Sequence, residues 1–504
     1  MRSRTALLNI TASLLLQFTL ILSGFIIPWL IIRTYGSGVN GVIASISQFL
    51  GFFSLLEGGV GGVVRSALYK SLASNDVITV SRILKSAEKF FRRVSYIFIV
   101  FLLLMAIGYP YLVSYGFSKT FIFTLVLILG IKTISQYYFG ITYQILLQAD
   151  QKLYITSYLH LIAIIVSTLV AAILINLGAN IHLVQFFSAG VFFLKPIMLN
   201  IYVKRNYKLI NNCLEDKNEL KQKWDGMGHH IAYFLHNKTD IVILTLFLSV
   251  KEVSVYSVYM MVVTGIRSLI TTISSSIEST FGNMIAKGEK ESLEENFNIV
   301  EFIFFILITV LFTSASLLVL PFVNVYTKGV TDADYFQPIF AYIILAAEAI
   351  YCIRLPYHSV VIAAGHFKQT RNGAFLEAGI NIVVSLIMVN FLGIIGVAIG
   401  TLCSVLFRTV QYALYLSENV LNRNFLKLIK RCAVNLCAII TIILVSQLFP
   451  TIDIHNYFQW AVYACEITVI AVVCTLIFNS IFYYSDIKKL VVILKKMLMK
   501  IFKE

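Results

Sequence analysis

The chain has 504 residues, of which 59% are hydrophobic and 13% are charged, and its mean hydropathy is +0.85. Soluble domains carry about 25% charged residues, so this composition excludes a soluble globular protein and predicts an all-α, polytopic membrane protein. The net charge of +15 comes largely from short segments between apolar runs, which membrane orientation explains better than nucleic-acid binding. The seven cysteines form no CxxC pair or His/Cys cluster, so the sequence suggests no disulfide framework, metal site or cofactor.

The apolar runs predict about fourteen transmembrane helices. The first follows Arg2 and Arg4, and it is too long for the core of a signal peptide. Six spans precede a polar joint, six follow it, and a further pair precedes the tail. The expected ranges are 11–32, 40–64, 94–114, 119–147, 153–177 and 181–202, then 228–248, 253–285, 299–321, 336–363, 372–392 and 394–416, then 432–449 and 458–481.

The two six-helix segments coincide at a shift of about 214 to 215 residues, which indicates a duplicated unit. At this shift residues 143–150 fall on 358–365, and Leu177-Gly178 falls on Leu392-Gly393. We therefore expect five parts: an N-terminal six-helix lobe at 1–203, a cytoplasmic joint at 204–227, a C-terminal six-helix lobe at 228–418, two additional helices at 419–481 and a basic amphipathic tail at 482–504.

Lysine and arginine predict the orientation. If the N-terminus is inside, most of the 40 lie in inner segments, among them the basic loops 65–93, 204–223 and 423–431 and the tail 488–503. The outer cations are Arg33, Lys119, Lys251 and Lys328. This distribution obeys the positive-inside rule, so we expect both termini in the cytoplasm. The longest outer loop, at about 322–337, is too short for a folded external domain.

Six cations lie inside predicted spans, where a charge among lipid tails costs at least about 2.5 kcal/mol. They are Lys132, Lys195, Lys238, Arg267, Arg354 and Arg408. Such side chains face a bundle interior or a wet cavity. On three helices the cation shares a face with other polar residues at helical spacing. These sets are Thr264, Arg267, Thr271, Ser274 and Glu278, then Lys132, Gln136 and Tyr143, then Tyr351, Arg354 and His358.

The interior cations have two interpretations. Arg267 either contacts a ligand or pairs with a buried acid, such as Glu377 or Glu348, and ties helices together. The same alternatives remain for Lys132 and Arg354. The candidate ligand-binding cations of a central cavity are Arg267, Lys132, Arg354 and Lys238.

Lys195 and Arg408 lie nearer the ends of their helices, where a long side chain reaches the headgroups, and that interpretation is favoured for both. His236 and Asp240 are four residues apart and share a face, so they either relay a proton or form a satisfied interior pair. The candidate residues for ion coupling are His236, Asp240, Glu348 and Glu377.

The opening of the chain carries a set of residues at informative spacings: Pro28, the run Arg33-Thr34-Tyr35-Gly36, Gly41, the run FSLLEGG at 53–59, and Val64-Arg65. On these residues it resembles the polysaccharide flippases of the multidrug/oligosaccharidyl-lipid/polysaccharide exporter superfamily. The resemblance extends to about residue 418, and the additional helix pair is similar to that of fourteen-helix members, which include the lipid II flippases.

This resemblance implies two six-helix lobes around a central cavity, working by alternating access. It implies transport of an undecaprenyl-diphosphate-linked oligosaccharide from the inner to the outer leaflet of the bacterial cytoplasmic membrane, for surface polysaccharides such as O-antigen, lipopolysaccharide or capsule. It assigns Arg33 and Arg65 structural roles. A diphosphate needs cations to cross an apolar medium, and arginine holds phosphate oxygens bidentately.

The expected partners are this lipid-linked saccharide, membrane lipids and other polysaccharide-assembly membrane proteins, with no nucleic acid and no bond chemistry. Two other functions remain open. A multidrug and toxin extrusion antiporter would need an interior acid; the first helix has none, but Asp240, Glu278, Glu348, Glu377 and Glu466 keep that alternative open. A polytopic polysaccharide polymerase or glycosyltransferase would usually present catalytic residues on a sizeable external loop, and the sequence predicts none.

Overall fold

The computed structural model describes residues 2–113, 116–210, 239–421, 423–449 and 454–501. These residues are mostly helical and contain no strand, and twelve of their segments are long and apolar enough to cross a membrane. The all-α, polytopic prediction is thereby confirmed. The chain forms two compact units: unit 1 comprises residues 1–257 and 329–333, and unit 2 comprises residues 258–328 and 334–504.

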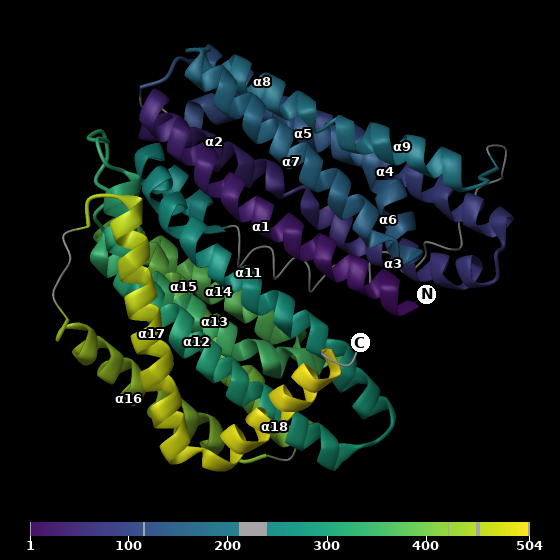
Figure 1. Ribbon diagram of the computed structural model, residues 1–504. Coiled ribbons are helices and arrows are strands. Elements are labelled where there is room, and N and C mark those ends of the chain that lie inside the picture. Colours follow the sequence, from purple (N-terminus) through teal and green to yellow (C-terminus); the bar gives the residue numbers. More distant parts are fainter. Residues whose placement is uncertain (1, 114–115, 211–238, 422, 450–453, 502–504) are drawn as a thin grey trace. The chain divides into compact units, whose positions relative to one another are not determined.

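Unit 1 is built from the helices coloured purple to blue in Figure 1. Their bounds are α1 Arg2–Tyr35, α2 Ser37–Gly51, α3 Ser54–Ala73, α4 Val77–Leu112, α5 Lys119–Ser135, the π-helical turn η1 Gln136–Gly140, α6 Ile141–Ala149, α7 Leu153–Asn176, α8 Ile181–Val191 and α9 Leu194–Asn206. Residues 239–247 are also helical. The joint predicted at 204–227 lies mostly outside the described residues, so the lobe boundaries stay a prediction.

Unit 2 is built from the helices coloured teal to yellow, and α11 begins in unit 1 and continues into it (Figure 1). Their bounds are α11 Val250–Ala286, α12 Lys290–Tyr326, α13 Pro338–Ala363, α14 Phe367–Leu392, α15 Ile394–Asn419, α16 Leu426–Ser446, α17 Tyr457–Phe482 and α18 Tyr484–Ile501. The additional pair α16 and α17 packs against α12, and α18 contacts both α12 and α17.

Two of the fourteen expected spans are not among the twelve. The span expected at 228–248 falls largely outside the described residues. The single helix expected at 40–64 is wrong, because the chain breaks between α2 and α3. There the amides of Phe52 and Phe53 donate to carbonyls three residues back, at 3.2 and 3.3 Å, directly after Gly51, a weak helix former.

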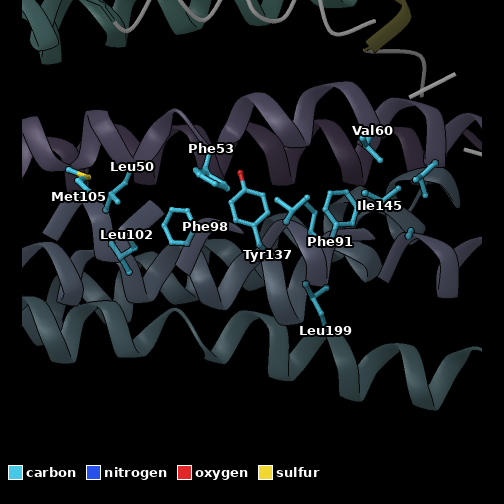
Figure 2. Close-up of a cluster of buried hydrophobic side chains, with 14 of the residues drawn as sticks. Leu50, Phe53, Val60, Phe91, Phe98, Leu102, Met105, Tyr137, Ile145 and Leu199 are labelled. Atoms are coloured by element: carbon cyan, nitrogen blue, oxygen red, sulfur yellow. The ribbon is translucent and has the colours of Figure 1, made fainter. Parts of the chain in front are cut away.

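The break places Phe53 in the core of unit 1. Its ring centroid lies 4.8 Å from that of Phe98 and 5.2 Å from that of Phe101, both on α4. Figure 2 shows Phe53, Phe98 and Tyr137 gathered in one cluster. Aromatic packing of this kind contributes about 0.5–1.5 kcal/mol per pair beyond area burial, so it helps to hold the broken segment in place.

The basic segment at 65–93, which we expected to be a loop, is helical on both sides of a short turn at 74–76. The helix α4 therefore begins 17 residues before its expected apolar span. Asp76 caps its start, because its carboxylate accepts from the amide of Thr79 at 3.0 Å and from the hydroxyl of Thr79 at 2.6 Å. We predicted a loop here from the high charge density of residues 65–93, but the end of a helix outside the membrane can be equally polar.

Small residues bring pairs of helices into close contact. A Cβ on Gly400 would lie 2.0 Å from the Ser385 hydroxyl oxygen and 2.8 Å from its amide nitrogen, so α15 crosses α14 almost backbone to backbone. In unit 1, a Cβ on Gly41 would lie 1.6 Å from the carbonyl oxygen of Val250, at the start of α11. Beside it, Asn40 donates to the Ser254 hydroxyl at 2.8 Å.

Candidate functional site

The first component of the candidate site is an ion pair inside unit 2. Arg267 on α11 reaches Glu348 on α13, with its Nη1 atom 3.2 and 3.3 Å from the two carboxylate oxygens. The two side chains are 14% and 6% exposed. This is one of the two pairings that the sequence left open for Arg267, and Glu377 is engaged elsewhere.

Tyr351 lies between two guanidinium groups. Arg267 stands 4.2 Å and Arg354 4.5 Å from the centroid of its ring. Arg354 also donates from Nη1 to Glu377 Oε1 on α14, at 2.5 Å, and both side chains are 8% exposed. Because cation–π contacts are strongest when desolvated, about 2 kcal/mol or more, this ring holds both cations in the interior.

Arg408 on α15 completes the set and is 2% exposed. Its Nε atom lies 3.5 Å from Glu377 Oε2, and its Nη1 atom donates to the Thr370 carbonyl at 3.0 Å and to Gln411 at 2.5 Å. Its Nη2 atom donates to the Tyr412 hydroxyl at 2.9 Å. The prediction that Arg408 reaches the headgroups is therefore wrong: polar groups in the helix interior hold it.

We call Arg267, Glu348, Tyr351, Arg354, Glu377 and Arg408 the arginine cluster. It joins four helices, α11, α13, α14 and α15, and its three guanidinium groups and two carboxylates leave one net positive charge. A positive charge in a low-dielectric interior attracts an anion far more strongly than one in water. The cluster is thus suited to stabilise a negatively charged group.

The other polar residues predicted near these cations occupy separate places. Ser274 on α11 bonds Ser359 on α13 at 2.9 Å, hydroxyl to hydroxyl. Thr271 bonds its own helix at the Ser268 carbonyl, 3.0 Å away. Glu278 is partly buried one turn beyond Ser274. His358 stacks edge-on against Tyr412, with ring centroids 5.4 Å apart. Thr264 donates to the Met260 carbonyl. Two members of the predicted α11 stripe, Arg267 and Ser274, form hydrogen bonds with residues of α13.

Unit 1 contains a smaller polar cavity of about 30 Å³. Its polar lining comprises Lys132, Gln136, Gln144, His160 and Lys195. Lys132 Nζ lies 3.9 Å from the Phe192 ring centroid, and Lys195 Nζ donates to Gln144 at 2.9 Å. The volume admits a water molecule but no diphosphate. Tyr143 packs against the core cluster instead of lining this cavity.

Sequence reasoning separated two lysines that the structure brings together. Lys195 was expected to reach the headgroups, but it shares this cavity with Lys132, and none of the described residues that line the cavity is a carboxylate. The π-helical turn η1 explains why Tyr143 does not line this cavity, because its extra residue per turn rotates Tyr143 away from the face of Lys132 and Gln136.

The residues predicted for ion coupling are placed in part. His236 lies outside the described residues, as does Lys238, which was predicted as a ligand-binding cation, so the proton relay through His236 and the role of Lys238 stay predictions. Asp240 is 6% exposed and accepts from the Tyr256 hydroxyl at 2.9 Å, within unit 1. Glu348 and Glu377 belong to the arginine cluster. No group of three His, Cys, Asp or Glu side chains in the part of the chain described could hold a metal ion.

The sequence missed a second buried network in unit 2. Arg423 and Arg431 were expected in an inner basic loop, but their side chains are 3% and 6% exposed, and Arg431 lies within α16. Both contact Glu301 on α12, which is 1% exposed and also accepts from the Tyr357 hydroxyl. The one available signal was a carboxylate inside an apolar run, NIVEFIFF.

Comparison with known proteins shows the fold. No protein-family model and no curated protein matches the sequence. Among solved structures, a lipid II flippase MurJ in an inward closed conformation matches with a TM-score of 0.71 and 16% identity, over 95% of this chain and 100% of that chain.

Two multidrug transporters are also similar. An inward-facing MATE family transporter of the MOP superfamily matches with a TM-score of 0.61 and 12% identity, over 79% of this chain and 95% of that chain. A mutant of the Vibrio cholerae MATE transporter VcmN matches with a TM-score of 0.58 and 13% identity, over 84% of this chain and 98% of that chain. The chain thus has the fold of these membrane transporters, the fold that its sequence resemblance implied.

Proposed function

We propose that the chain is a flippase that carries an undecaprenyl-diphosphate-linked oligosaccharide from the inner to the outer leaflet of the bacterial cytoplasmic membrane, by alternating access. Two observations support this proposal: the likeness in fold to a lipid II flippase over 95% of the chain, and the net positive arginine cluster in the interior of unit 2. The oligosaccharide is assembled into a cell-surface polysaccharide, and the protein makes and breaks no bond.

The observation that carries the proposal is the position of Arg267. Its guanidinium is mostly buried, lies on the face of Tyr351 and contacts Glu348 through one nitrogen at 3.2 and 3.3 Å, a long separation for a charge-assisted hydrogen bond. A diphosphate offers more acceptor oxygens and more charge than one carboxylate. In the proposed cycle the diphosphate displaces Glu348 from Arg267, and Tyr351 keeps the guanidinium in place.

Displacement would free Glu348, and a carboxylate released inside an apolar bundle binds a proton or a cation. Binding of the diphosphate at Arg267 is therefore coupled to uptake of an ion at Glu348. Glu377 cannot take this role as easily, because Arg354 and Arg408 both contact it. Within this proposal Glu348 is the coupling residue.

A MATE-type antiporter is the second candidate function, and its supporting observations are the likeness to MATE transporters and the buried acids Glu348, Glu377 and Asp240. In unit 2, however, Glu348 and Glu377 are both compensated by arginine, and the cluster as a whole is positive. A cationic drug would be repelled there unless an arginine moved away.

The test is a strain from which the encoding sequence has been deleted. A flippase deficiency leaves undecaprenyl-diphosphate-linked oligosaccharide on the inner leaflet, where a non-permeant lectin or hydrolase added to spheroplasts does not reach it. Complementation should return the oligosaccharide to the outer leaflet. If the deletion leaves the lipid-linked pool unchanged and instead raises sensitivity to cationic drugs, the antiporter function replaces the flippase.

A further inference from the structure

The polar cavity of unit 1 lies where two membrane-spanning segments depart from regular α-helix. One departure is η1, which contributes Gln136 and Gly140 to the lining. The other lies between α8 and α9, where the amides of Phe192 and Phe193 donate to carbonyls three residues back, at 3.1 and 3.0 Å, and Phe192 lines the cavity. Irregular backbone at membrane depth occurs where it is buried in protein or lines a cavity, and π-helical turns are frequent at functional sites. The proposed transport cycle makes no use of this cavity.

Close packing holds the two departures together. A Cβ on Gly140 would lie 3.2 Å from Pro196 Cβ, so η1 rests directly on the start of α9. Pro196 stands in the first turn of that helix, where its missing amide proton costs no helical hydrogen bond. The wall of the cavity is therefore fixed by the backbone and not by long, mobile side chains.

Lys132 brings a positive charge to this cavity, near the middle of the span Lys119–Ala149. Its Nζ atom lies 3.9 Å from the Phe192 ring centroid, a contact that stabilises a cation without neutralising it. Among the described residues no carboxylate pairs with Lys132, and the described lining of the cavity contains none. An ammonium at this depth is strongly disfavoured without a counter-charge beside it. The cavity is therefore suited to an anion that accepts from Lys132.

Neutral donors from three other elements point to the same kind of ligand. The carbonyl oxygen of Gln144 on α6 accepts from Lys195 Nζ at 2.9 Å, which leaves the Gln144 amide nitrogen as a donor. Gln136 on η1 and His160 on α7 line the cavity as well. These three side chains are half-buried and Lys132 is exposed, so all four keep accessible surface where they line the cavity. Together they offer one ammonium and three neutral polar groups to a bound ion.

The size of the cavity selects a small anion. Its volume is about 30 Å³, and one water molecule needs about 10–15 Å³. A halide ion is a sphere slightly larger than a water molecule, whereas phosphate carries four oxygens around its central atom. A sphere accepts hydrogen bonds from any direction, which suits donors that come from separate helices. The ammonium of lysine is likewise a compact point charge, without the planar fork with which arginine binds phosphate.

We propose that this cavity binds a small monovalent anion of the halide class, such as chloride. The ion accepts from Lys132 Nζ and from the amide nitrogen of Gln144, with Gln136 and His160 as further donors. It neutralises Lys132 within the membrane and joins α5, η1, α6 and α7. This inference does not depend on the identity of the transported substrate.

Two variants separate the bound ion from ordinary packing. Lys132→Gln removes the ammonium, and because no described carboxylate pairs with Lys132, the change leaves no acid unpaired there and the protein should fold. Gln144→Glu places a carboxylate in the cavity, so the protein itself supplies the counter-charge. The matched control is Lys119→Gln on the same helix, because Lys119 Nζ also lies 3.9 Å from a ring centroid, that of Tyr111, but does not line the cavity.

The experiment is thermal unfolding of the purified full-length protein in gluconate, which is replaced stepwise by chloride, bromide or phosphate at constant ionic strength. Chloride and bromide should raise the melting temperature of the wild type and of Lys119→Gln in a saturable way. Lys132→Gln should weaken the apparent halide affinity about ten- to hundredfold. Gln144→Glu should not respond to halide. Crystals grown in bromide should show an anomalous scattering peak between Lys132 and Gln144.

Each part of the proposal has a result that overturns it. An equal halide response in the wild type and in Lys132→Gln would place the ion elsewhere. A response to phosphate that matches the halide response and depends on Lys132 would replace the halide by a phosphate group, such as one carried by a lipid. No response to any anion, together with no bromide peak in the cavity, would show that the cavity holds water and that Lys132 needs no counter-ion.

Discussion

Replacing Arg267 separates its role as a ligand from its role as a partner of Glu348. The variant Arg267→Gln leaves Glu348, 6% exposed, without its cation. Breaking a buried pair on one side costs about 3–5 kcal/mol, and 1–2 kcal/mol already changes cellular abundance several-fold. We therefore expect a fall in protein level that hides any effect on transport. The double variant Arg267→Gln/Glu348→Gln removes both charges and should restore most of the level.

Transport by the double variant is then compared with transport by Glu348→Gln alone, because Glu348 is itself proposed to couple transport to an ion. If Arg267 holds the diphosphate, its loss removes a charge-assisted contact of about 1.5–3 kcal/mol, so flipping should fall about ten- to hundredfold at normal protein level. Arg267→Lys should retain partial activity, because lysine keeps the positive charge but lacks the planar guanidinium that binds two phosphate oxygens at once. The measurement is outer-leaflet appearance of the lipid-linked oligosaccharide, normalised to protein, with the exposed Arg371→Gln as control. Full transport by a well-expressed double variant would refute the ligand role.

Three further predictions test packing, capping and orientation. Gly400→Val should lower protein level, because a Cβ there would lie 2.8 Å from the Ser385 amide, whereas Gly379→Ala, with open space, should not; in-gel fluorescence measures both. Hydrogen bonds from Thr79 lower the pKa of Asp76, so its cap on α4 is fully present above about pH 4 and is lost as the pH falls further. The melting-temperature gap between wild type and Asp76→Ala should therefore close in acid. Reporter fusions should report the cytoplasm at Ser74, Glu294 and Asn424 and the outside at Ser37 and Thr331; a cytoplasmic signal at Thr331 would refute this topology.

The membrane-spanning helices were predictable because the length of an apolar run can be read directly from the sequence, without knowledge of three-dimensional contacts. The expected span 153–177, for example, matches α7 to within one residue, and the expected span 372–392 lies within α14. Interruptions were harder to predict. The break at Phe53 depends on its contact with an aromatic ring of α4. The extension of α4 back to Val77 depends on the Asp76 cap and on polar side chains, for which a hydropathy profile predicts a loop. Each error arose because the contacts that decide the structure are not visible in hydropathy averaged over a sequence window.

The site was predictable only to the level of a helix face. Periodicity indicated that Arg267 and Ser274 share a face, and both do contact α13. Periodicity does not say which helix lies opposite, so the choice between Glu348 and Glu377 stayed open in the sequence. For the same reason Lys132 and Lys195, on α5 and α9, were judged separately although they line one cavity.

The three arginines of the arginine cluster differ in exposure and in their polar contacts, and that difference supports the proposal that Arg267 exchanges partners. Arg408 has a carboxylate, a carbonyl, an amide and a hydroxyl within 3.5 Å and is 2% exposed, which makes it a fixed strut between α14 and α15. Arg354 is tied to Glu377 at 2.5 Å. Arg267 is the most exposed of the three, at 14%, and its 3.2 Å contact with Glu348 is longer than the contact of Arg354 with Glu377. A binding site needs fixed charges to set the local potential and one charge whose partner can be exchanged, and we propose that Arg408 and Arg354 are the fixed charges and Arg267 the exchanging one.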